Sequence, residues 1–252
     1  MANWYEAYIP NSKGLRLAAL CLHSGTDSRG WIIVCHGFTG SKEGGGKAKA
    51  MAETLAAQTG FSFVLFDFAG NGHSEGEFED LTLSAQIQDL RSIIDWSLDL
   101  KKMPVITMGR SFGGSTVLAQ AAADPRVQAV CTWAAPAHLT DLFSDVILSE
   151  TEDGRVQLAD ADGTVFLKND FLQDLKAFDL FQAAVVLAPR SLLLIHGEND
   201  DVVPVSDARE LYAAAQEPKE LHIVPQADHQ FSTTSEQVWE IVGHWLNRLH
   251  LE

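Results

Sequence analysis

A series of short, mostly apolar runs, each the length of one strand, most constrains the fold of this chain. A continuous apolar run without alternation is typical of a strand that is covered on both faces. We therefore expect the runs at 30–35 and 61–66 to be buried strands and the others to be strands of the same sheet. The runs are "GWIIVC" (30–35), "FSFVLF" (61–66), "PVITMG" (104–109), "QAVCTWAA" (128–135), "SLLLIH" (191–196) and "ELHIVP" (220–225).

Helical patterns separate these runs. Segment 81–98 carries apolar residues at helical spacing, from Leu83 through Leu90 to Leu98. Strands that alternate with helices predict an α/β fold with a mostly parallel central sheet and helices on both faces. Two early strands, "WYEAYIP" and "LRLAALCLH", are joined by a turn at "NSKG" and precede this pattern. We expect further helices at 47–58, 112–123, 207–216 and 235–249.

Residues 136–187 interrupt the alternation. Connections between elements usually span about 2–6 residues, and this one is far longer. It contains "RVQLADADGTVFLK" (155–168), which alternates around an Asp-Gly turn and predicts a hairpin. Phenylalanines supply apolar mass. We expect a small cap over the carboxyl ends of the strands, within a single domain spanning 1–252; the alternative is a surface subdomain without a role in binding.

Composition excludes some classes of partner. The formal net charge is −16, and an acidic surface repels nucleic-acid phosphates. The cysteines Cys21, Cys35 and Cys131 are odd in number and lie among apolar residues, which predicts buried free thiols in a reducing compartment. No apolar stretch approaches the ~18 residues of a membrane span, and the N-terminal segment lacks a signal-peptide pattern. We expect a cytoplasmic protein without membrane contact and leave homodimer formation open.

Four polar loops follow predicted strands. They are "HGFTG" (36–40), "GRSFGG" (109–114), "HGENDDVVP" (196–204) and "ADHQF" (227–231). Because ligands of such sheets bind beyond the carboxyl ends of the strands, the loops mark a candidate site. A serine, a pair of aspartates and a histidine occur there in an order that the hydrolases of this architecture share. The motif G-x-S-x-G alone is weak evidence for a nucleophile, since a glycine-rich loop with a serine can simply end a buried strand.

The chemistry of these loops favours nucleophilic catalysis. Ser111 needs a neighbouring base, and His229 can take and return a proton near neutrality. A tight turn would present Ser111, while Gly109 and Gly113 avoid collisions across it. We expect the amides of Phe112 and Phe38 to form an oxyanion hole, since backbone donors stabilise a developing negative charge.

The four loops, in this order, resemble the α/β-hydrolase superfamily over nearly the whole chain. That family carries its acid in "HG-x-x-D-x-x-V-P", a pattern which selects Asp200 over Asp201. Together with "HGFTGSKE" and "FDFAGNGHSEGEFEDLT", the long insertion looks like the bacterial feruloyl and cinnamoyl esterases. The resemblance implies an aromatic pocket under the cap. One departure is Arg110, where the family usually has histidine; we expect this side chain to point away from the oxyanion.

These observations predict a serine hydrolase that cleaves small to medium carboxylic esters through an acyl-enzyme, with hydroxycinnamoyl esters included. A thioesterase, an amidase or peptidase, a lipase or a lactonase would share the same loops, and an inactive binding protein is an alternative of a different class. We expect no cofactor and no metal, because "GNGHSEG" and "GSKEGGGK" miss the dinucleotide and P-loop spacings. Candidate substrate contacts are His138, Phe143 and Phe166. His36 and His196 are expected to hold loop backbones.

Overall fold

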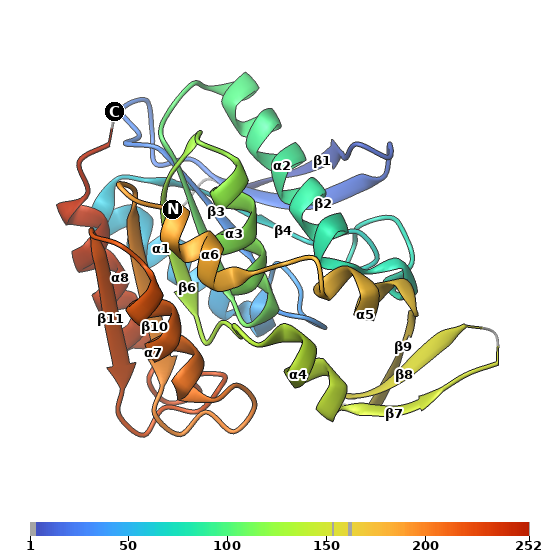
Figure 1. Ribbon diagram of the computed structural model, residues 1–252. Helices are drawn as coiled ribbons and strands as arrows, with labels where there is room; N and C mark the ends of the chain where they lie inside the picture. Colours follow the sequence, from blue (N-terminus) through green and yellow to red (C-terminus); the bar gives the residue numbers. More distant parts are fainter. Residues whose placement is uncertain (1–3, 153, 161–162, 252) are drawn as a thin grey trace.

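The six predicted apolar runs all form strands of one eight-stranded sheet; the run at 220–225 lies at its edge and the other five lie inside it. The computed structural model describes residues 4–152, 154–160 and 163–251 (Figure 1). The strand order in the sheet is β1-β2-β4-β3-β5-β6-β10-β11. The strands are β1 (Trp4–Pro10), β2 (Arg16–Leu22), β3 (Trp31–Cys35), β4 (Ser62–Phe66), β5 (Val105–Arg110), β6 (Val127–Trp133), β10 (Ser191–Gly197) and β11 (Lys219–Val224).

The sheet is parallel from β4 to β11, and β2 alone runs opposite to the other strands, since it pairs antiparallel with both β1 and β4. The two antiparallel strands form the early hairpin. Its turn is fixed by Asn11, whose side-chain oxygen accepts from the amides of Lys13 and Leu15, and by Gly14, whose φ is +81°. The predicted fold class is therefore confirmed, and so is the predicted hairpin at "NSKG".

Helices cover both faces of the sheet. On one face lie α1 (Lys47–Thr59) and α8 (Ser235–Arg248). The other face is covered by α2 (Leu83–Leu100), α3 (Phe112–Ala123), α6 (Leu180–Val186) and α7 (Val205–Ala214). Strand β10 shows why its run is continuously apolar: Leu192 and Leu194 enter the core on the α3 side, whereas Leu193 and Ile195 enter the core under α1 and α8.

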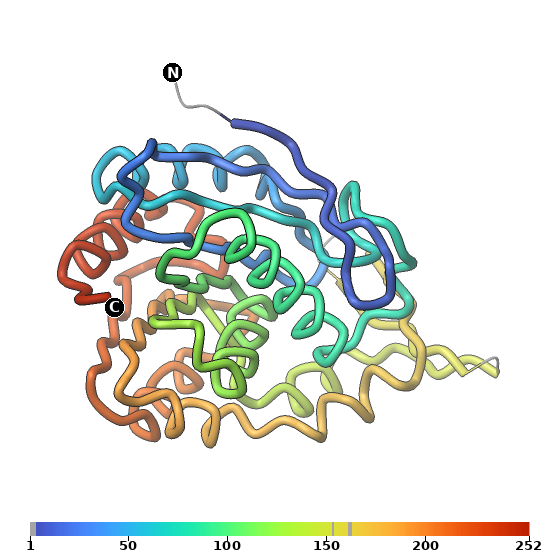
Figure 2. Tube along the Cα trace, turned by 90° about the horizontal axis from the view of Figure 1, so that it is seen from above, coloured from blue at the N-terminus to red at the C-terminus, as the bar shows by residue number. Residues whose placement is uncertain are grey.

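The long connection between β6 and β10 has structure of its own. It contains α4 (Leu139–Asp145), a small sheet of β7 (Ile147–Glu150), β8 (Arg155–Asp160) and β9 (Gly163–Lys168), and then α5 (Asp170–Leu175). Strands β8 and β9 pair antiparallel as predicted, although the aspartate of the Asp-Gly turn lies outside the described residues. Figures 1 and 2 show β7–β9 extending away from the main sheet.

The end of this connection does not lie over the strand ends. Helix α6 contacts α3 and α7, so residues 180–186 run along one face of the main sheet. Single turns of 3-10 helix, η1 (Gly44–Gly46) and η2 (Phe78–Asp80), precede α1 and α2, and β9 packs against η2. The insertion therefore contacts the body through β9 in its middle and through α6 at its end.

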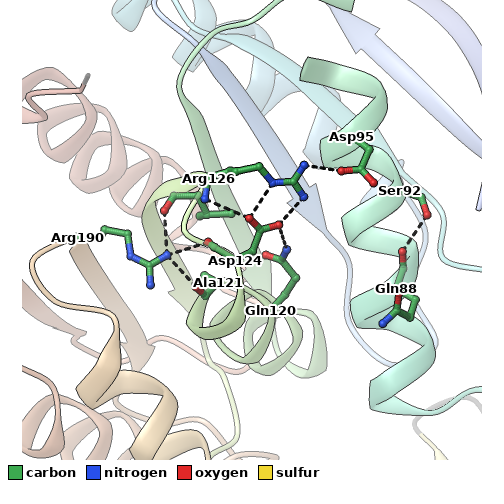
Figure 3. A network of polar contacts seen from close by, with 9 residues as sticks. Gln88, Ser92, Asp95, Gln120, Ala121, Asp124, Arg126 and Arg190 are labelled. Carbon is green, nitrogen blue, oxygen red and sulfur yellow. Dashed lines mark hydrogen bonds and ion pairs between the residues drawn. The ribbon is translucent and has the colours of Figure 1, made fainter. Parts of the chain in front are cut away.

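Helix α3 is anchored at its C-terminal end by two guanidinium groups (Figure 3). Arg190 Nη1 donates to the carbonyl oxygens of Ala121 at 2.8 Å and Asp124 at 3.0 Å. Arg126 binds the Asp124 carboxylate, with Nη2 2.7 Å from Oδ2, and also reaches Asp95 of α2. Cations near a helix C-terminus offset its partial negative charge. The network holds α3 at the end remote from the loops at the carboxyl edge of the sheet.

The prediction that the cysteines are buried free thiols is confirmed. Cys21, Cys35 and Cys131 are buried free thiols. No helix in the described part of the chain combines the length and the apolar character that crossing a membrane requires.

Candidate active site

Three polar side chains that are distant in sequence converge at the carboxyl edge of the sheet. Ser111 directly follows β5, whereas Asp200 and His229 lie in the loops after β10 and β11. Because these strands lie on one side of the sheet in the order β5-β6-β10-β11, their loops meet. Nε2 of His229 lies 3.1 Å from Oγ of Ser111, and Nδ1 lies 2.8 Å from Oδ2 of Asp200. This line of contacts can move a proton from the hydroxyl to the imidazole.

The turn that carries Ser111 is tight and strained. Ser111 has φ 53° and ψ −129°, a conformation that L-residues adopt only where their surroundings impose it. A Cβ on Gly109 would lie 2.1 Å from the carbonyl oxygen of Gly113, and one on Gly113 would lie 2.2 Å from that of His36. The Ser111 amide donates to the carbonyl oxygen of Trp133 at 2.7 Å. Both glycines are thus required to bring β5, α3 and β3 together.

Asp200 is held as an anion. Its side chain is buried, and Oδ1 accepts hydrogen bonds from the amides of Val202 at 2.9 Å and Val203 at 2.8 Å. Burial alone would raise its pKa, but hydrogen bonds from His196, His229 and the Val203 amide together hold the pKa far below its ordinary range. Asp200 can therefore accept from Nδ1–H of His229, which leaves Nε2 free to receive the serine proton.

Two backbone amides lie beside the serine. The Phe112 amide begins α3, and the Phe38 amide belongs to the loop after β3. Neither donates to another group in the part of the chain that the structure describes. The loop approaches the nucleophile closely, since a Cβ on Gly37 would lie 3.3 Å from Cβ of Ser111. The arrangement can offer two donors at the start of a helix, where the partial charge is positive.

His36 fixes the loop that carries Phe38. Its Nδ1 lies 2.7 Å from the carbonyl oxygen of Gly37, and its Nε2 accepts from the Phe68 amide at 3.1 Å. Burial lowers the pKa of His36, and the nearby cations Arg110 and Lys42 lower it further against the opposing effect of the Gly37 carbonyl. A neutral ring satisfies both contacts with one donor and one acceptor. The prediction that His36 holds loop backbone is confirmed.

Comparisons with known proteins agree with this geometry. A family model described as "alpha/beta hydrolase fold" matches residues 30–189, more than half of the chain. The chain belongs to the α/β-hydrolase family. It is 26% identical over 206 residues to an uncharacterized protein, YfhR, of Escherichia coli O157:H7; the match covers 79% of the chain and 62% of that relative.

Solved α/β-hydrolases resemble the whole chain. The esterase domain of a Rhodothermus marinus protein is 29% identical, with a TM-score of 0.78 and 98% of each chain covered. Est1E of Butyrivibrio proteoclasticus, in a structure with bound ferulic acid, is 22% identical, with a TM-score of 0.84. That match covers 95% of this chain and 98% of Est1E, and at this identity it shows the fold alone.

A buried ion pair in this hydrolase was not anticipated from its sequence. Lys42 Nζ lies 2.6 Å from Oδ2 of Asp67, and both side chains are almost fully buried. Asp67 also accepts from the amides of Lys42 and His73. The pair joins the loop after β3 to the loop after β4. Its residues lie inside the quoted motifs "HGFTGSKE" and "FDFAGNGHSEGEFEDLT", which were the only available signal.

His196 also has a larger part than predicted. It is fully buried, and Nε2 lies 3.0 Å from the carbonyl oxygen of Val203 and 3.2 Å from Oδ2 of Asp200. It therefore holds loop backbone, as expected, and contacts the carboxylate as well. The i,i+4 spacing of His196 and Asp200 was a signal that could have indicated this contact.

Of the three candidate substrate contacts, one lies beside the serine loop and two lie elsewhere. Phe143 of α4 is buried against Phe38 and Phe112, at ring-centroid distances of 5.0 and 5.3 Å. His138 instead contacts Glu210 of α7 at 2.8 Å. Phe166 is exposed on β9, beneath the guanidinium of Arg155. The described contacts place Phe143 next to the serine loop and link His138 and Phe166 to other surfaces, because the insertion folds outward.

The phenylalanines nearest the serine form one cluster. Phe38, Phe112, Phe143 and Phe171 all pack against one another, with ring centroids 4.8 to 6.0 Å apart. The cluster joins the two residues that carry the candidate oxyanion amides to α4 and α5 of the insertion. In the described ranges, no group of three or more His, Cys, Asp or Glu residues is arranged to hold a metal.

Arg110 points away from this cluster. Its guanidinium donates to the side-chain oxygen of Gln230, the residue after His229. Gln230 was not singled out from the sequence, because nothing in "ADHQF" distinguishes it from an ordinary surface residue.

Proposed function

We propose that this α/β-hydrolase is a serine-dependent carboxylic-ester hydrolase acting on small to medium esters, including those with an aromatic acyl group. The observation that carries the proposal is the hydrogen-bonded line from Ser111 through His229 to a buried, ionised Asp200. A hydroxyl becomes a useful nucleophile when a positioned base removes its proton as it attacks.

In the proposed mechanism, Ser111 Oγ attacks the ester carbonyl carbon while its proton moves to Nε2 of His229. The carbonyl oxygen becomes an oxyanion that accepts from the amides of Phe38 and Phe112. His229 returns the proton to the leaving alcohol as the C–O bond breaks, which leaves an acyl-serine. Water, activated by the same imidazole, then releases the carboxylic acid and restores Ser111.

Asp200 is proposed to orient His229 and to stabilise the imidazolium that forms during each step. Its two backbone donors and its contact with His196 hold the carboxylate still, so that one oxygen always faces Nδ1. Asp201 is exposed and follows it directly, and no role is assigned to it.

The esterase assignment is supported by the likeness to the Rhodothermus marinus esterase domain over 98% of both chains. An aromatic acyl group is suggested by the structure of Est1E with ferulic acid and by the phenylalanine cluster beside the serine.

A fluorophosphonate probe tests the nucleophile. We expect the wild type to be labelled and to hydrolyse p-nitrophenyl acetate, and we expect Ser111→Ala to do neither. Ser206→Ala, which changes an exposed serine on α7, is the matched control and should behave as the wild type does. Equal labelling of Ser111→Ala and wild type would contradict the proposal.

A substrate panel tests the reaction class. It compares p-nitrophenyl esters, methyl hydroxycinnamates, acyl-CoA thioesters and anilides at equal concentration, with kcat/KM as the readout. We expect the oxygen esters to be preferred and the hydroxycinnamates to be accepted. A preference for anilides would assign a peptidase, and a preference for acyl-CoA would assign a thioesterase.

A further inference from the structure

A cavity of about 380 Å³ lies behind Ser111, on the face of the sheet that α1 and α8 cover. The phenylalanine cluster lies elsewhere, and none of its members lines this cavity. The walls come from both helices and from the ends of β3, β5 and β6. Apolar side chains dominate: Ala48, Met51, Trp133, Phe231, Val238 and Trp239.

The charged residues of this cavity are all cationic. Arg110, Lys42 and Lys47 line it, and no aspartate or glutamate of the described chain does. That composition is unusual in a protein whose net charge is −16. Lys42 is neutralised by Asp67, so Arg110 and Lys47 set the sign of the site.

Arg110 has no carboxylate partner among the residues that the structure describes. Its hydrogen-bond partner there is the neutral amide oxygen of Gln230. Burial lowers the pKa of Arg110, and the charge of Asp200 acts in the opposite direction. A guanidinium that is partly removed from water and lacks an anionic partner is a strong binder for a planar anion, because it can donate two parallel hydrogen bonds.

The start of α1 adds to the positive potential. Gly44, Gly45 and Lys47 line the cavity, and the first turn of this 13-residue helix contains no acidic residue. A helix N-terminus carries a partial positive charge that acts within about one turn. The potential of the backbone therefore has the same sign as that of the side chains.

Arg110 lies close to the reacting hydroxyl. A Cβ on Gly37 would be 3.3 Å from Cβ of Ser111 and 3.8 Å from Nη2 of Arg110. Both groups thus flank the same point of the loop after β3. An anionic group bound by Arg110 is therefore held beside the loop that flanks Ser111, although Ser111 itself does not line the cavity.

From the cavity, its charges and its position, we propose that it is a second substrate subsite, which takes an apolar group bearing a carboxylate and pairs that carboxylate with Arg110. The inference rests on the proposed function, because it makes esters with a free carboxylate the preferred substrates. The apolar walls, which include Trp133 and Trp239, accept the carbon skeleton.

Binding can be measured separately from catalysis with Ser111→Ala and isothermal titration calorimetry. The probes are 3-phenylpropionate and its neutral analogue 3-phenylpropan-1-ol. We expect the acid to bind more tightly than the alcohol. Adding Arg110→Gln should weaken binding of the acid about 10- to 100-fold, the range expected for a charge-assisted contact, with little effect on the alcohol. Arg209→Gln removes an exposed guanidinium on α7 and should change neither affinity.

A second pair of variants tests the location. Ala48→Phe places a ring in the cavity and should abolish binding of both probes, whereas Ala50→Phe places the same ring on the exposed side of α1 and should not. Thermal unfolding of each variant shows that it is folded. If Arg110→Gln does not fold, Arg110→Lys serves instead, since it keeps the charge but loses the paired donors and should weaken the acid alone.

The inference is overturned if acid and alcohol bind equally, if Ala48→Phe leaves binding of the acid intact, or if inorganic phosphate binds through Arg110 while 3-phenylpropionate does not. These failures differ from a failure of the proposed function. Wild type that hydrolyses esters while Ser111→Ala does not bind the acid refutes the subsite alone. A chain that binds the acid at Arg110 but hydrolyses no ester refutes the proposed function.

Discussion

At the scale of single residues, Asp200 and Asp201 show how neighbours in sequence acquire different chemistry. Asp200 is buried, accepts two backbone hydrogen bonds and faces His229 and His196, whereas Asp201 is exposed. The difference arises from the path of the loop after β10, which turns one carboxylate inward. A carboxylate that is buried and surrounded by donors keeps its charge.

Asp200→Asn tests this asymmetry. An amide can still accept from Val202 and Val203, but its NH₂ group then faces Nδ1–H of His229, donor against donor. We expect kcat for p-nitrophenyl acetate to fall by about 10²- to 10⁴-fold, because the imidazole loses its productive tautomer. Asp201→Asn is the control and should keep kcat within about twofold. Similar losses in both variants would contradict the assignment.

The low pKa of Asp200 also predicts how stability depends on pH. Its folded pKa lies below its unfolded value of about 3.9, so the carboxylate stabilises the fold above that value and the contribution is lost as pH falls. The difference in free energy of unfolding between wild type and Asp200→Asn should therefore be constant above about pH 5 and shrink progressively as the pH falls below it. Urea unfolding at several pH values measures it. A difference that stays constant over the whole range would show that the carboxylate is not specifically stabilised.

At the scale of elements, contacts between loops position the site more than any single helix or strand does. The loop after β3 is tied to the loop after β4 by the Lys42–Asp67 pair and by the bond from Phe68 to His36. The phenylalanine cluster ties the same loop to the start of α3 and to the insertion. These ties fix the Phe38 amide relative to Ser111.

The buried pair should be costly to break. Asp67→Asn leaves the Lys42 ammonium buried without a counter-charge, and we expect it to lower the free energy of unfolding by about 3–5 kcal/mol. Glu75→Gln breaks the exposed pair with Arg16 and should cost far less, because water solvates both charges. Equal effects in chemical denaturation would show that burial does not decide the outcome.

The serine turn should tolerate no side chain at Gly109. Gly109→Ala places a Cβ against the Gly113 carbonyl, which belongs to the backbone and cannot move alone. We expect loss of the folded enzyme, or a Tm lowered by on the order of 10 °C or more. Gly243→Ala on α8 meets the ends of two side chains, Gln58 closely and Leu55 at ordinary contact distance, and should leave Tm nearly unchanged. Comparable Tm values for both variants would argue against the tight turn.

At the scale of the whole molecule, charge acts against the compact state. A net charge of −16 repels itself across the surface, while the guanidinium network at the end of α3 and the cationic cavity are local exceptions. Salt screens such repulsion over about a Debye length. The positive cavity should consequently attract anions more strongly at low ionic strength.

Salt should stabilise the protein for the same reason. We expect Tm at neutral pH to rise by on the order of a few degrees between about 0.01 M and about 0.5 M NaCl. Near pH 4.8, the pI calculated from the sequence, the net repulsion vanishes and so should the rise. Differential scanning calorimetry at both pH values tests this, and an equal rise at both would point to a general salt effect.

Local sequence patterns were enough to predict the succession of strands and helices and to single out Ser111, an aspartate pair and His229 as candidate site residues. Strands that are covered on both faces consist of consecutive apolar residues, which is a pattern visible in the sequence. The tight turn at Ser111 admits only glycine at Gly109 and Gly113, so it too gives a recognisable local motif. The choice of Asp200 needed the family pattern in addition.

Only the tertiary structure decided which distant residues meet. Two contacts join segments that are far apart in the chain: the Lys42–Asp67 pair and the contact of Gln230 with Arg110. The outward course of β7–β9, which carries Phe166 to the surface, depends on how the insertion packs. Such contacts are fixed by the folding of the whole sheet, and a lysine or glutamine carries no periodic pattern that would mark its partner in advance.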